Sequence, residues 1–343
     1  MNTAKKLDFR SDTVTLPTDE MRRAMAAAPV GDDVYQEDPT INRLQEMAAE
    51  ITGKEAGLLV PSGTMGNLAS ILSHCQRGDE IIVGKKAHIF LYEAAGAAAL
   101  GGVNIQTIPN QPDGTLSFDD LEAAIRPEDE HQPITRMIAL ENTHNRCNGV
   151  SISPEYTRKF ADFARDRGLK FHLDGARIFN AAVDQGVPVS ALTAPADSVT
   201  FCLSKGLSAP VGSVICGSRE FIQKAHRVRK QLGGGMRQAG ILAAAGIVSL
   251  TSMVERLSQD HQNARTLARL LAELPGIEID PASQHTNMVY FSLSSAQPSL
   301  GDFRRKLAGS GLLVGGGSDR IRMVTHAWVD EDDVAKAVEI VQK

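Results

Sequence analysis

Lys205 is the single charged residue in the stretch 198–217, where it stands between two apolar, β-branched runs at residues 198–203 and 213–216. An ammonium group that leaves water is strongly disfavoured unless it is paired, neutralised or used covalently. Desolvation also makes an amine a better nucleophile toward an aldehyde, because it lowers the pKa of the amine. The stretch therefore predicts either a lysine that captures a carbonyl compound or a lysine at an exposed hairpin tip, and the segment alone does not separate the two.

Asp174 and Arg177 follow a predicted strand at residues 169–173. A carboxylate at Asp174 could pair with the protonated ring nitrogen of pyridoxal phosphate and so keep the ring an electron sink. It could equally cap the next helix, and the two roles are compatible. Arg177 offers a planar, bidentate donor that suits a substrate carboxylate, unless it is an ordinary surface arginine.

Three further places carry residues that could bind or react. Gly63 and Thr64 follow Ser62 at the start of a predicted helix, where free N–H groups and the helix dipole favour a phosphate, although Ser and Thr also cap helices routinely. His88 and His144 each follow a predicted strand. Either could stack on a flat ring or relay a proton, but a loop histidine satisfied by its neighbours is the commoner outcome.

These residues need a scaffold, and the alternation of apolar runs indicates one. Strands are predicted at 56–60, 80–83, 103–108, 136–140 and 169–173, with helical segments between them, including a helix-like run over 89–100. Such alternation predicts an α/β fold with a mostly parallel central sheet and helices on both faces. Ligands of such sheets lie at the carboxyl ends of the strands, where all of the residues above fall. No Gly-x-Gly-x-x-Gly follows a strand, so the dinucleotide fingerprint is missing.

The chain divides, on this pattern, into a large domain at 1–250 and a small C-terminal α+β domain at 251–343. The helical stretch 236–274 is predicted to change direction near Thr251. Beyond it, short strands and two helices at 300–308 and 330–341 make up the small unit. The extended segment 1–17 is expected to pack with the small domain or with a neighbouring subunit.

Composition narrows the class further. The 343 residues are 42% apolar and 22% charged, as in an ordinary globular enzyme, and the net charge of −5 gives no general attraction to nucleic acid or an anionic membrane. A basic cluster at 226–230 is the one feature that favours a nucleic-acid-binding alternative, and it lacks interleaved aromatic residues. No apolar run approaches ~20 residues, and no secretory signal is expected. Four cysteines predict neither a disulfide framework nor a metal site, so a cytoplasmic location is expected.

Taken together, the motifs resemble the L-threonine aldolases, also called low-specificity threonine aldolases, of the β-eliminating lyase group of fold-type I pyridoxal-phosphate enzymes. The resemblance covers nearly the whole chain. It rests on residues 9–15, 29–35, 61–64, 140–145, 173–180, 202–207, 233–240 and 322–326.

The resemblance implies a role for each matched residue. Lys205 would bind the cofactor covalently as a Schiff base, Asp174 would pair with its ring nitrogen, and His88 would stack on the ring. Gly63 and Thr64 would bind the phosphate. Ser11, Arg177 and Arg322 would hold the carboxylate of the amino acid, and His144 would lie near its side-chain hydroxyl. Lys230 and Arg237 would contact the cofactor phosphate across a subunit interface. No metal is expected.

The implied reaction is reversible cleavage of L-threonine or L-allo-threonine to glycine and acetaldehyde, in a homo-oligomer, a tetramer built as a dimer of dimers. Another reaction of the same scaffold, such as β-elimination or serine hydroxymethyl transfer, is the alternative. Two departures stand out: Ser208 occupies a position where glycine is usual, and residues 145–152 lack the Gly-rich, Pro-ending loop of many relatives. The second departure bears on stereochemical preference.

Overall fold

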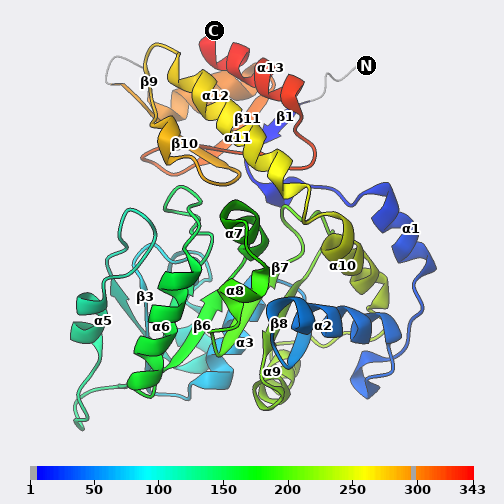
Figure 1. Cartoon of the computed structure of the whole chain (residues 1–343), viewed down its shortest axis with the longest axis vertical. Coiled ribbons are helices and arrows are strands. Elements are labelled where there is room, and N and C mark those ends of the chain that lie inside the picture. The colour runs from blue at the N-terminus through cyan, green and yellow to red at the C-terminus, as the bar shows by residue number, and fades with distance from the viewer. Residues whose placement is uncertain (1–5, 295–298) are drawn as a thin grey trace.

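Seven strands form the larger sheet of the computed structural model, which describes residues 6–294 and 299–343 (Figure 1). The spatial order is β2-β8-β7-β6-β5-β3-β4. The strands β7, β6, β5, β3 and β4 run parallel, whereas β8 is antiparallel to both of its neighbours. Their bounds are β2 Ala56–Val60, β3 Asp79–Gly84, β4 Asn104–Ile108, β5 Ile134–Glu141, β6 Lys170–Asp174, β7 Ser198–Cys202 and β8 Ser213–Gly217.

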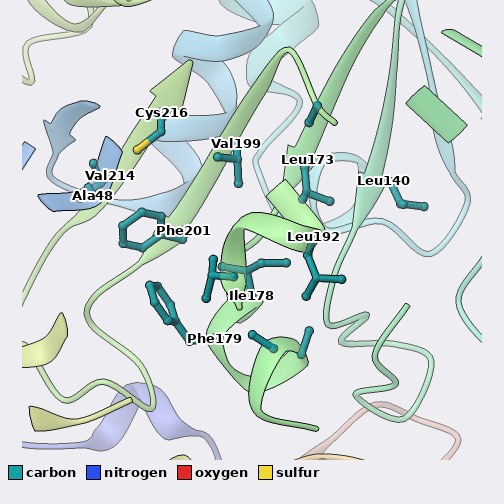
Figure 2. Packing of buried hydrophobic residues seen from close by; sticks show 14 of the residues in the cluster. Ala48, Leu140, Leu173, Ile178, Phe179, Leu192, Val199, Phe201, Val214 and Cys216 are labelled. Atoms are coloured by element: carbon teal, nitrogen blue, oxygen red, sulfur yellow. The ribbon is translucent and has the colours of Figure 1, made fainter. Parts of the chain in front are cut away.

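Helices cover both faces of this sheet, because successive side chains of a strand point to opposite sides. In β2, Leu59 joins one hydrophobic cluster while Leu58 and Val60 join another, and the second cluster includes residues of α3 and α9. The first cluster packs Phe179 and Leu192 of two short helices against the other face (Figure 2). The helices are α1 Asp19–Ala27, α2 Pro39–Thr52, α3 Gly63–His74, α4 His88–Leu91, α5 Phe118–Ala124, α6 Pro154–Asp166, α7 Ile178–Gln185, α8 Val189–Thr193, α9 Arg219–Gln231 and α10 Gly240–Ser252, with shorter turns η1 Asp12–Val14, η2 Asp33–Tyr35 and the π-helix η3 Ala97–Gly101.

A second, five-stranded sheet lies at the top of Figure 1 and has the order β1-β11-β12-β10-β9. Its elements are β1 Leu7–Phe9, α11 Leu257–Ala272, β9 Ile277–Glu278, η4 Pro281–Ser283, β10 Met288–Leu293, α12 Leu300–Gly309, β11 Leu312–Gly316, β12 Ile321–Val324 and α13 Glu331–Gln342. The N-terminal strand β1 pairs in parallel with β11, and Phe9 is fully buried in the core of this sheet. The predicted fold class is thus confirmed; the boundary at residue 250 stays a prediction.

The helix predicted over residues 89–100 is wrong. Only the four residues of α4 are helical before the chain turns, and Ala94 and Ala95 have φ of 51° and 54°. In a continuous helix, a residue five positions on would face about 140° away. The break instead brings Glu93 back to His88, with 2.8 Å between Oε1 and Nδ1. The contact between His88 and Glu93 is therefore incompatible with the continuous helix that the apolar pattern predicted.

The predicted change of direction after α10 is confirmed, since α10 and α11 meet at 69°. Within the described ranges, no single helix has both the length and the apolar character needed to cross a membrane. The bent α10–α11 pair passes that test only when its two halves are taken together, and α10 is largely buried in the fold.

Ser208 lies in the turn after Lys205 with a φ of 62°, a conformation that costs a residue with a Cβ about 1–2 kcal/mol. Its side chain is fully buried, and its hydroxyl has no hydrogen-bond partner among the described residues. A serine at this position therefore strains the turn.

Ser208→Gly is expected to raise the free energy of unfolding by about 1–2 kcal/mol, because it removes the strain and the unpaired hydroxyl at the smaller cost of a more flexible unfolded chain. Urea denaturation measures the change. Gln36→Gly is the control, since Gln36 has nearly the same φ of 61° on the surface and reports the backbone contribution alone. A loss of stability in Ser208→Gly would contradict the argument.

Candidate active site

The residues that the sequence placed after strands lie at one edge of the larger sheet. Val60 ends β2 and Cys202 ends β7, and both pair with Ser213 at the start of β8. Glu141 and Asp174 end β5 and β6 side by side. The carboxyl ends of the strands other than the antiparallel β8 therefore lie at the same edge, which brings residues distant in sequence into one site.

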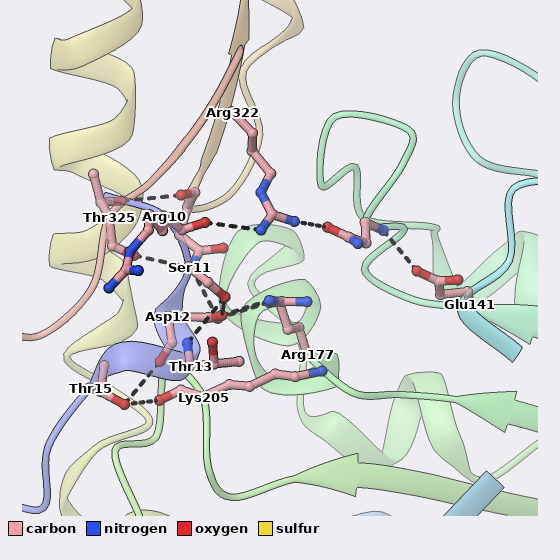
Figure 3. A network of polar contacts seen from close by, with 12 residues as sticks. Arg10, Ser11, Asp12, Thr13, Thr15, Glu141, Arg177, Lys205, Arg322 and Thr325 are labelled. Carbon is pink, nitrogen blue, oxygen red and sulfur yellow. Dashed lines mark hydrogen bonds and ion pairs between the residues drawn. The ribbon is translucent and has the colours of Figure 1, made fainter. Parts of the chain in front are cut away.

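Lys205 lies in the turn between β7 and β8 and lines a pocket of about 380 Å³. The hydroxyl of Thr15 donates to the backbone oxygen of Lys205 at 2.9 Å, so the N-terminal segment fixes this turn (Figure 3). The other residues that line the pocket come from both sheets: Ser11, Thr13, His88, Tyr92, Asn145, Arg146, Arg177, Tyr290, Gly316, Gly317 and Arg322. Five of the predicted site residues, Lys205, His88, Ser11, Arg177 and Arg322, thus share one pocket.

Arg177 is held by Asp12, a residue that the sequence reasoning did not single out (Figure 3). Its Nε donates to one carboxylate oxygen at 2.8 Å and its Nη2 to the other at 2.6 Å. Both side chains are buried. Burial alone would raise the pKa of Asp12, but the charge and hydrogen bonds of Arg177 outweigh it and hold that pKa far below its usual range. The two bonds orient the guanidinium and leave Nη1 for another partner.

Arg322 reaches the same pocket from β12 in the smaller sheet. Its Nη1 donates to Asn145 Oδ1 at 2.8 Å and its Nη2 to the backbone oxygen of Arg10 at 3.0 Å. Its Nε is buried without a hydrogen-bond partner in the described part of the chain. Buried polar groups are normally paired, so this donor fits an anionic ligand. Ser11 lies close by, where its hydroxyl accepts from the backbone N–H of Thr13 at 3.2 Å.

Asn145 is itself fixed by Glu141, another residue to which the sequence reasoning gave no role. One Glu141 oxygen accepts from the backbone N–H of Asn145 at 2.9 Å, and the other accepts from the backbone N–H of His88 at 2.7 Å. Glu141 therefore ties two loops of the pocket together at the end of β5.

His88 belongs to a hydrogen-bonded group with Glu93, Asn67 and Asp174. Its Nδ1 lies 2.8 Å from Glu93 Oε1, and the amide nitrogen of Asn67 donates to Glu93 at 2.8 Å and to Asp174 at 2.9 Å. Burial alone would lower the pKa of His88, but the Glu93 hydrogen bond and the nearby carboxylate charges outweigh it and raise that pKa. The ligand atoms of the three titratable residues in this group lie within 4.8 Å of one another, and Asn67 donates to one oxygen of each carboxylate.

His144 is not brought to the pocket. It is only 1% exposed, its Nε2 lies 3.1 Å from Asn110 Nδ2, and it is absent from the pocket lining. Burial alone would lower its pKa, but the charge of Glu141 outweighs it and raises the pKa. His88, by contrast, has a third of its side chain exposed at the pocket.

The four predicted phosphate contacts lie outside the pocket lining. Gly63 and Thr64 begin α3, and a Cβ on Gly63 would lie 2.9 Å from Cys202 Sγ, so this helix start is pressed against the end of β7. Lys230 is exposed on α9, and Arg237 is exposed and paired with Asp32 at 2.9 Å. The roles of these four residues stay predictions.

The donor set fits pyridoxal phosphate. An amine, a carboxylate held by Asn67, an imidazole and the unpaired Arg322 Nε gather at one edge, and a helix N-terminus without a side chain at Gly63 lies beside them. The sequence reasoning missed Asp12, Asn67 and Glu93. Asp12 stands inside the matched motif at residues 9–15, next to Ser11, which was the signal available; nothing in the pattern marked the other two.

Solved structures identify the fold. A threonine aldolase of Leishmania major superposes with a TM-score of 0.82 at 19% identity, covering 98% of both chains. A serine palmitoyltransferase of Sphingomonas wittichii gives 0.78 at 16% identity, over 99% of this chain and 87% of that one. The architecture is that of the fold-type I pyridoxal-phosphate enzymes.

Sequence similarity defines the family. The model of the beta-eliminating lyases matches residues 8–294, so the chain belongs to the beta-eliminating lyase family. Low-specificity L-threonine aldolase 1 of Arabidopsis thaliana is 49% identical over 335 residues, 96% of this chain and 94% of the relative. Low specificity L-threonine aldolase of Escherichia coli K12 is 47% identical over 331 residues, 96% of each. The family expected from the motifs is confirmed.

Proposed function

We propose that this protein is a low-specificity L-threonine aldolase that cleaves L-threonine or L-allo-threonine reversibly to glycine and acetaldehyde with pyridoxal phosphate. The observation that carries the proposal is the pocket in which Lys205 shares space with Arg177 and Arg322. An amine that can capture an aldehyde beside two guanidinium groups suits an enzyme that binds an amino acid by its carboxylate.

The carboxylate of the substrate binds between Arg177 and Arg322. Asp12 orients the first guanidinium, Asn145 and the Arg10 carbonyl orient the second, and the Ser11 hydroxyl contributes a further polar contact. Two-point fixation of a carboxylate sets the rotation about the bond between Cα and the amino nitrogen of the substrate, so the scissile Cα–Cβ bond is aligned for cleavage. The contribution of the two arginines to cleavage is therefore one of substrate orientation. It requires both sheets, because Arg322 lies on β12 of the smaller one.

Lys205 would hold the cofactor covalently, Asp174 would bind its ring nitrogen, and Gly63 with Thr64 would bind its phosphate at the start of α3. When bound, pyridoxal phosphate supplies a sink for the electron pair of the broken bond. His88 is the base that takes the proton from the β-hydroxyl of the substrate, because its ring reaches the pocket whereas His144 is enclosed by Asn110 and neighbouring chain.

The pH dependence of cleavage tests the role of His88. A base must be neutral, and the pKa of His88 is raised, so activity is expected to fall as pH decreases through a value above about 6.5. Glu93→Gln removes a negative charge at hydrogen-bonding distance from His88, which should lower the pKa of His88. The acid limb of the profile, the pH range in which activity falls, is therefore expected to move down by about one pH unit. The measurement is kcat/KM against pH. Tyr92→Phe, which keeps the ring that lies 5.4 Å from His88, should leave the limb in place. An unmoved limb in Glu93→Gln would contradict the assignment.

We also infer a cytoplasmic homo-oligomer, a tetramer, in which Lys230 and Arg237 serve the cofactor phosphate of a neighbouring copy. Their exposure on this chain supports such a role, as do apolar side chains exposed at Val34, Tyr35 and Phe90. Four unpaired cysteines, three of them buried, suit a reducing compartment. Light scattering of the purified protein measures the assembly.

One assay tests the activity. Purified protein with pyridoxal phosphate and each threonine diastereomer is expected to release acetaldehyde and glycine. Pyruvate and ammonia from serine would instead indicate β-elimination, and cleavage of serine only with a folate acceptor would indicate hydroxymethyl transfer. Release of no acetaldehyde from either diastereomer would overturn the proposal.

A further inference from the structure

Asn67 is the first residue of a line of polar side chains, which continues through His172 and Ser198 to His74. The line lies between α3 and the strands β6 and β7 and leads away from the site. Asn67 lies on α3, which approaches β7 closely because Gly66 has no side chain: a Cβ there would lie 2.4 Å from Thr200 Cγ2. Besides its two bonds to Glu93 and Asp174, the Asn67 oxygen lies 3.1 Å from His172 Nε2. Asn67 is 2% exposed and His172 is fully buried, so water does not supply these contacts.

The line continues away from the site. His172 Nδ1 lies 2.8 Å from Ser198 Oγ, and the same oxygen lies 2.8 Å from His74 Nε2 at the other end of α3. His74 stacks on Phe221 at 4.5 Å and lines a separate pocket of about 360 Å³. That pocket includes Lys170, the first residue of β6, and Asp197, which directly precedes β7. It therefore lies at the edge of the sheet opposite Asp174, which ends β6. α3 and its neighbours β6 and β7 are visible in Figure 1.

With both carboxylates ionised and both imidazoles neutral, one arrangement of hydrogens satisfies all of these side-chain contacts. Asn67 must turn its NH2 toward the two carboxylates, which accept, so its oxygen faces His172 and the Nε2 of that ring must be the donor. A neutral His172 then accepts at Nδ1 from the Ser198 hydroxyl, and Ser198 in turn accepts from Nε2 of His74. From His74 to Asp174, each hydrogen bond then donates toward Asp174, and Asn67 donates in addition to Glu93.

Both imidazoles are suited to remain neutral. Burial lowers the pKa of His172 to about 4, an effect that the charge of Asp174 and a hydrogen bond to the Ser198 backbone only partly offset. Burial, together with the neighbouring His172, lowers the pKa of His74 to about 3. The line cannot pass protons along its length, because the amide of Asn67 interrupts it. Aligned hydrogen bonds polarise one another, so the last N–H of the line is a stronger donor than an isolated amide.

We propose that Asn67, His172, Ser198 and His74 form a one-directional hydrogen-bond line whose function is to position the Asp174 carboxylate for the cofactor ring. The inference rests on the proposed function for the identity of that cofactor. The four residues act through Asp174 and are positioning residues. Carboxylate, amide and imidazole then share one fixed geometry, with the Ala176 N–H on the second oxygen of Asp174 at 3.1 Å.

Ser198→Ala and His172→Leu break the line, whereas His172→Gln keeps a donor and an acceptor in one side chain. Groups that orient the ligands of a bound metal typically contribute roughly 10- to 100-fold to affinity or activity, and we expect a similar factor for groups that orient Asp174. We therefore expect His172→Leu to weaken pyridoxal phosphate binding and to lower kcat by about 10-fold or more. Ser198→Ala should have the same two effects at about 3- to 10-fold, and His172→Gln should recover most of the loss seen in His172→Leu. KM for threonine should change little, because Arg177 and Arg322 are untouched.

Ser70→Ala is the matched control, since Ser70 is a buried serine on α3 whose hydroxyl, among the described residues, bonds only to the Gly66 carbonyl. Affinity is measured by titrating pyridoxal phosphate into cofactor-free protein and following its visible absorbance. Equal losses in Ser70→Ala and Ser198→Ala, or a His172→Leu protein with unchanged affinity and kcat, would overturn the proposal.

Nitrogen-15 NMR of histidine-labelled, cofactor-free protein provides a second readout that needs no activity. The line requires His172 and His74 to be neutral and protonated at Nε2 near pH 7. Protonation of His172 at Nδ1 would overturn the inferred direction. If wild-type protein binds no pyridoxal phosphate, the proposed function fails, and the NMR result still decides the direction of the line.

Discussion

Replacing Lys205 with alanine is expected to abolish threonine cleavage, with a loss of at least about 10³-fold in kcat, and to remove the visible absorbance of the cofactor-loaded protein. The reason is covalent: no other described lysine lines the pocket that holds Arg177 and Arg322. The fold should tolerate the change, because the Thr15 hydroxyl bonds to the backbone oxygen of residue 205 and not to its side chain.

Two controls sharpen this result. Lys205→Arg keeps the positive charge but not the nucleophilic amine, so it should be as inactive as the alanine variant. Lys85→Ala removes an exposed lysine near His88 and should retain activity. Borohydride reduction followed by peptide mapping locates the attached cofactor in wild-type protein, and an adduct on a lysine other than Lys205 would refute the assignment.

Asp12→Asn is expected to destabilise the protein by about 3–5 kcal/mol, because it leaves the buried Arg177 guanidinium without a counter-charge. The pair also joins the N-terminal segment, which enters the smaller sheet as β1, to the start of α7 on the larger one. We therefore expect threonine KM to rise as well, since Arg177 loses the bidentate partner that orients it. The free energy of unfolding in urea measures the first effect.

Asp8→Asn is the matched control on the same segment. Asp8 pairs with the exposed Arg10, and such surface pairs contribute about 0–1 kcal/mol. Arg177→Met combined with Asp12→Asn should recover part of the stability, because the uncompensated charge is gone. A loss below about 1 kcal/mol in Asp12→Asn would contradict the argument.

Acid pH provides a further check on the Asp12–Arg177 pair. The folded pKa of Asp12 lies far below its unfolded value near 3.9, so the ionised carboxylate stabilises the folded protein fully above that value. This contribution is lost as pH falls from about 4 toward the folded pKa. The difference in unfolding free energy between wild type and Asp12→Asn should therefore be constant above pH 5 and shrink in more acidic buffer.

Much of the fold was predictable because strands and helices carry local signals. Alternating apolar runs with caps such as Asp38–Pro39 mark the elements, and the rule that ligands meet the carboxyl ends of parallel strands gathers Gly63, His88, Asp174 and Lys205 at one edge. The motif at residues 9–15 likewise pointed to the N-terminal segment. The wrong helix prediction at residues 89–100 shows the limit of such signals. The chain leaves the helical conformation there, and Glu93 contacts His88.

The sequence by itself determined most of the order of the elements and the family, and it predicted the reactive groups, because each of these depends on residue type and near neighbours. Only the tertiary structure decided which groups meet. Asp12 and Arg177 are 165 positions apart, and Asn67 meets Asp174 across 107. Burial then decides how such a pair behaves: a carboxylate and a guanidinium removed from water must bind each other, and no local pattern in the chain records that requirement.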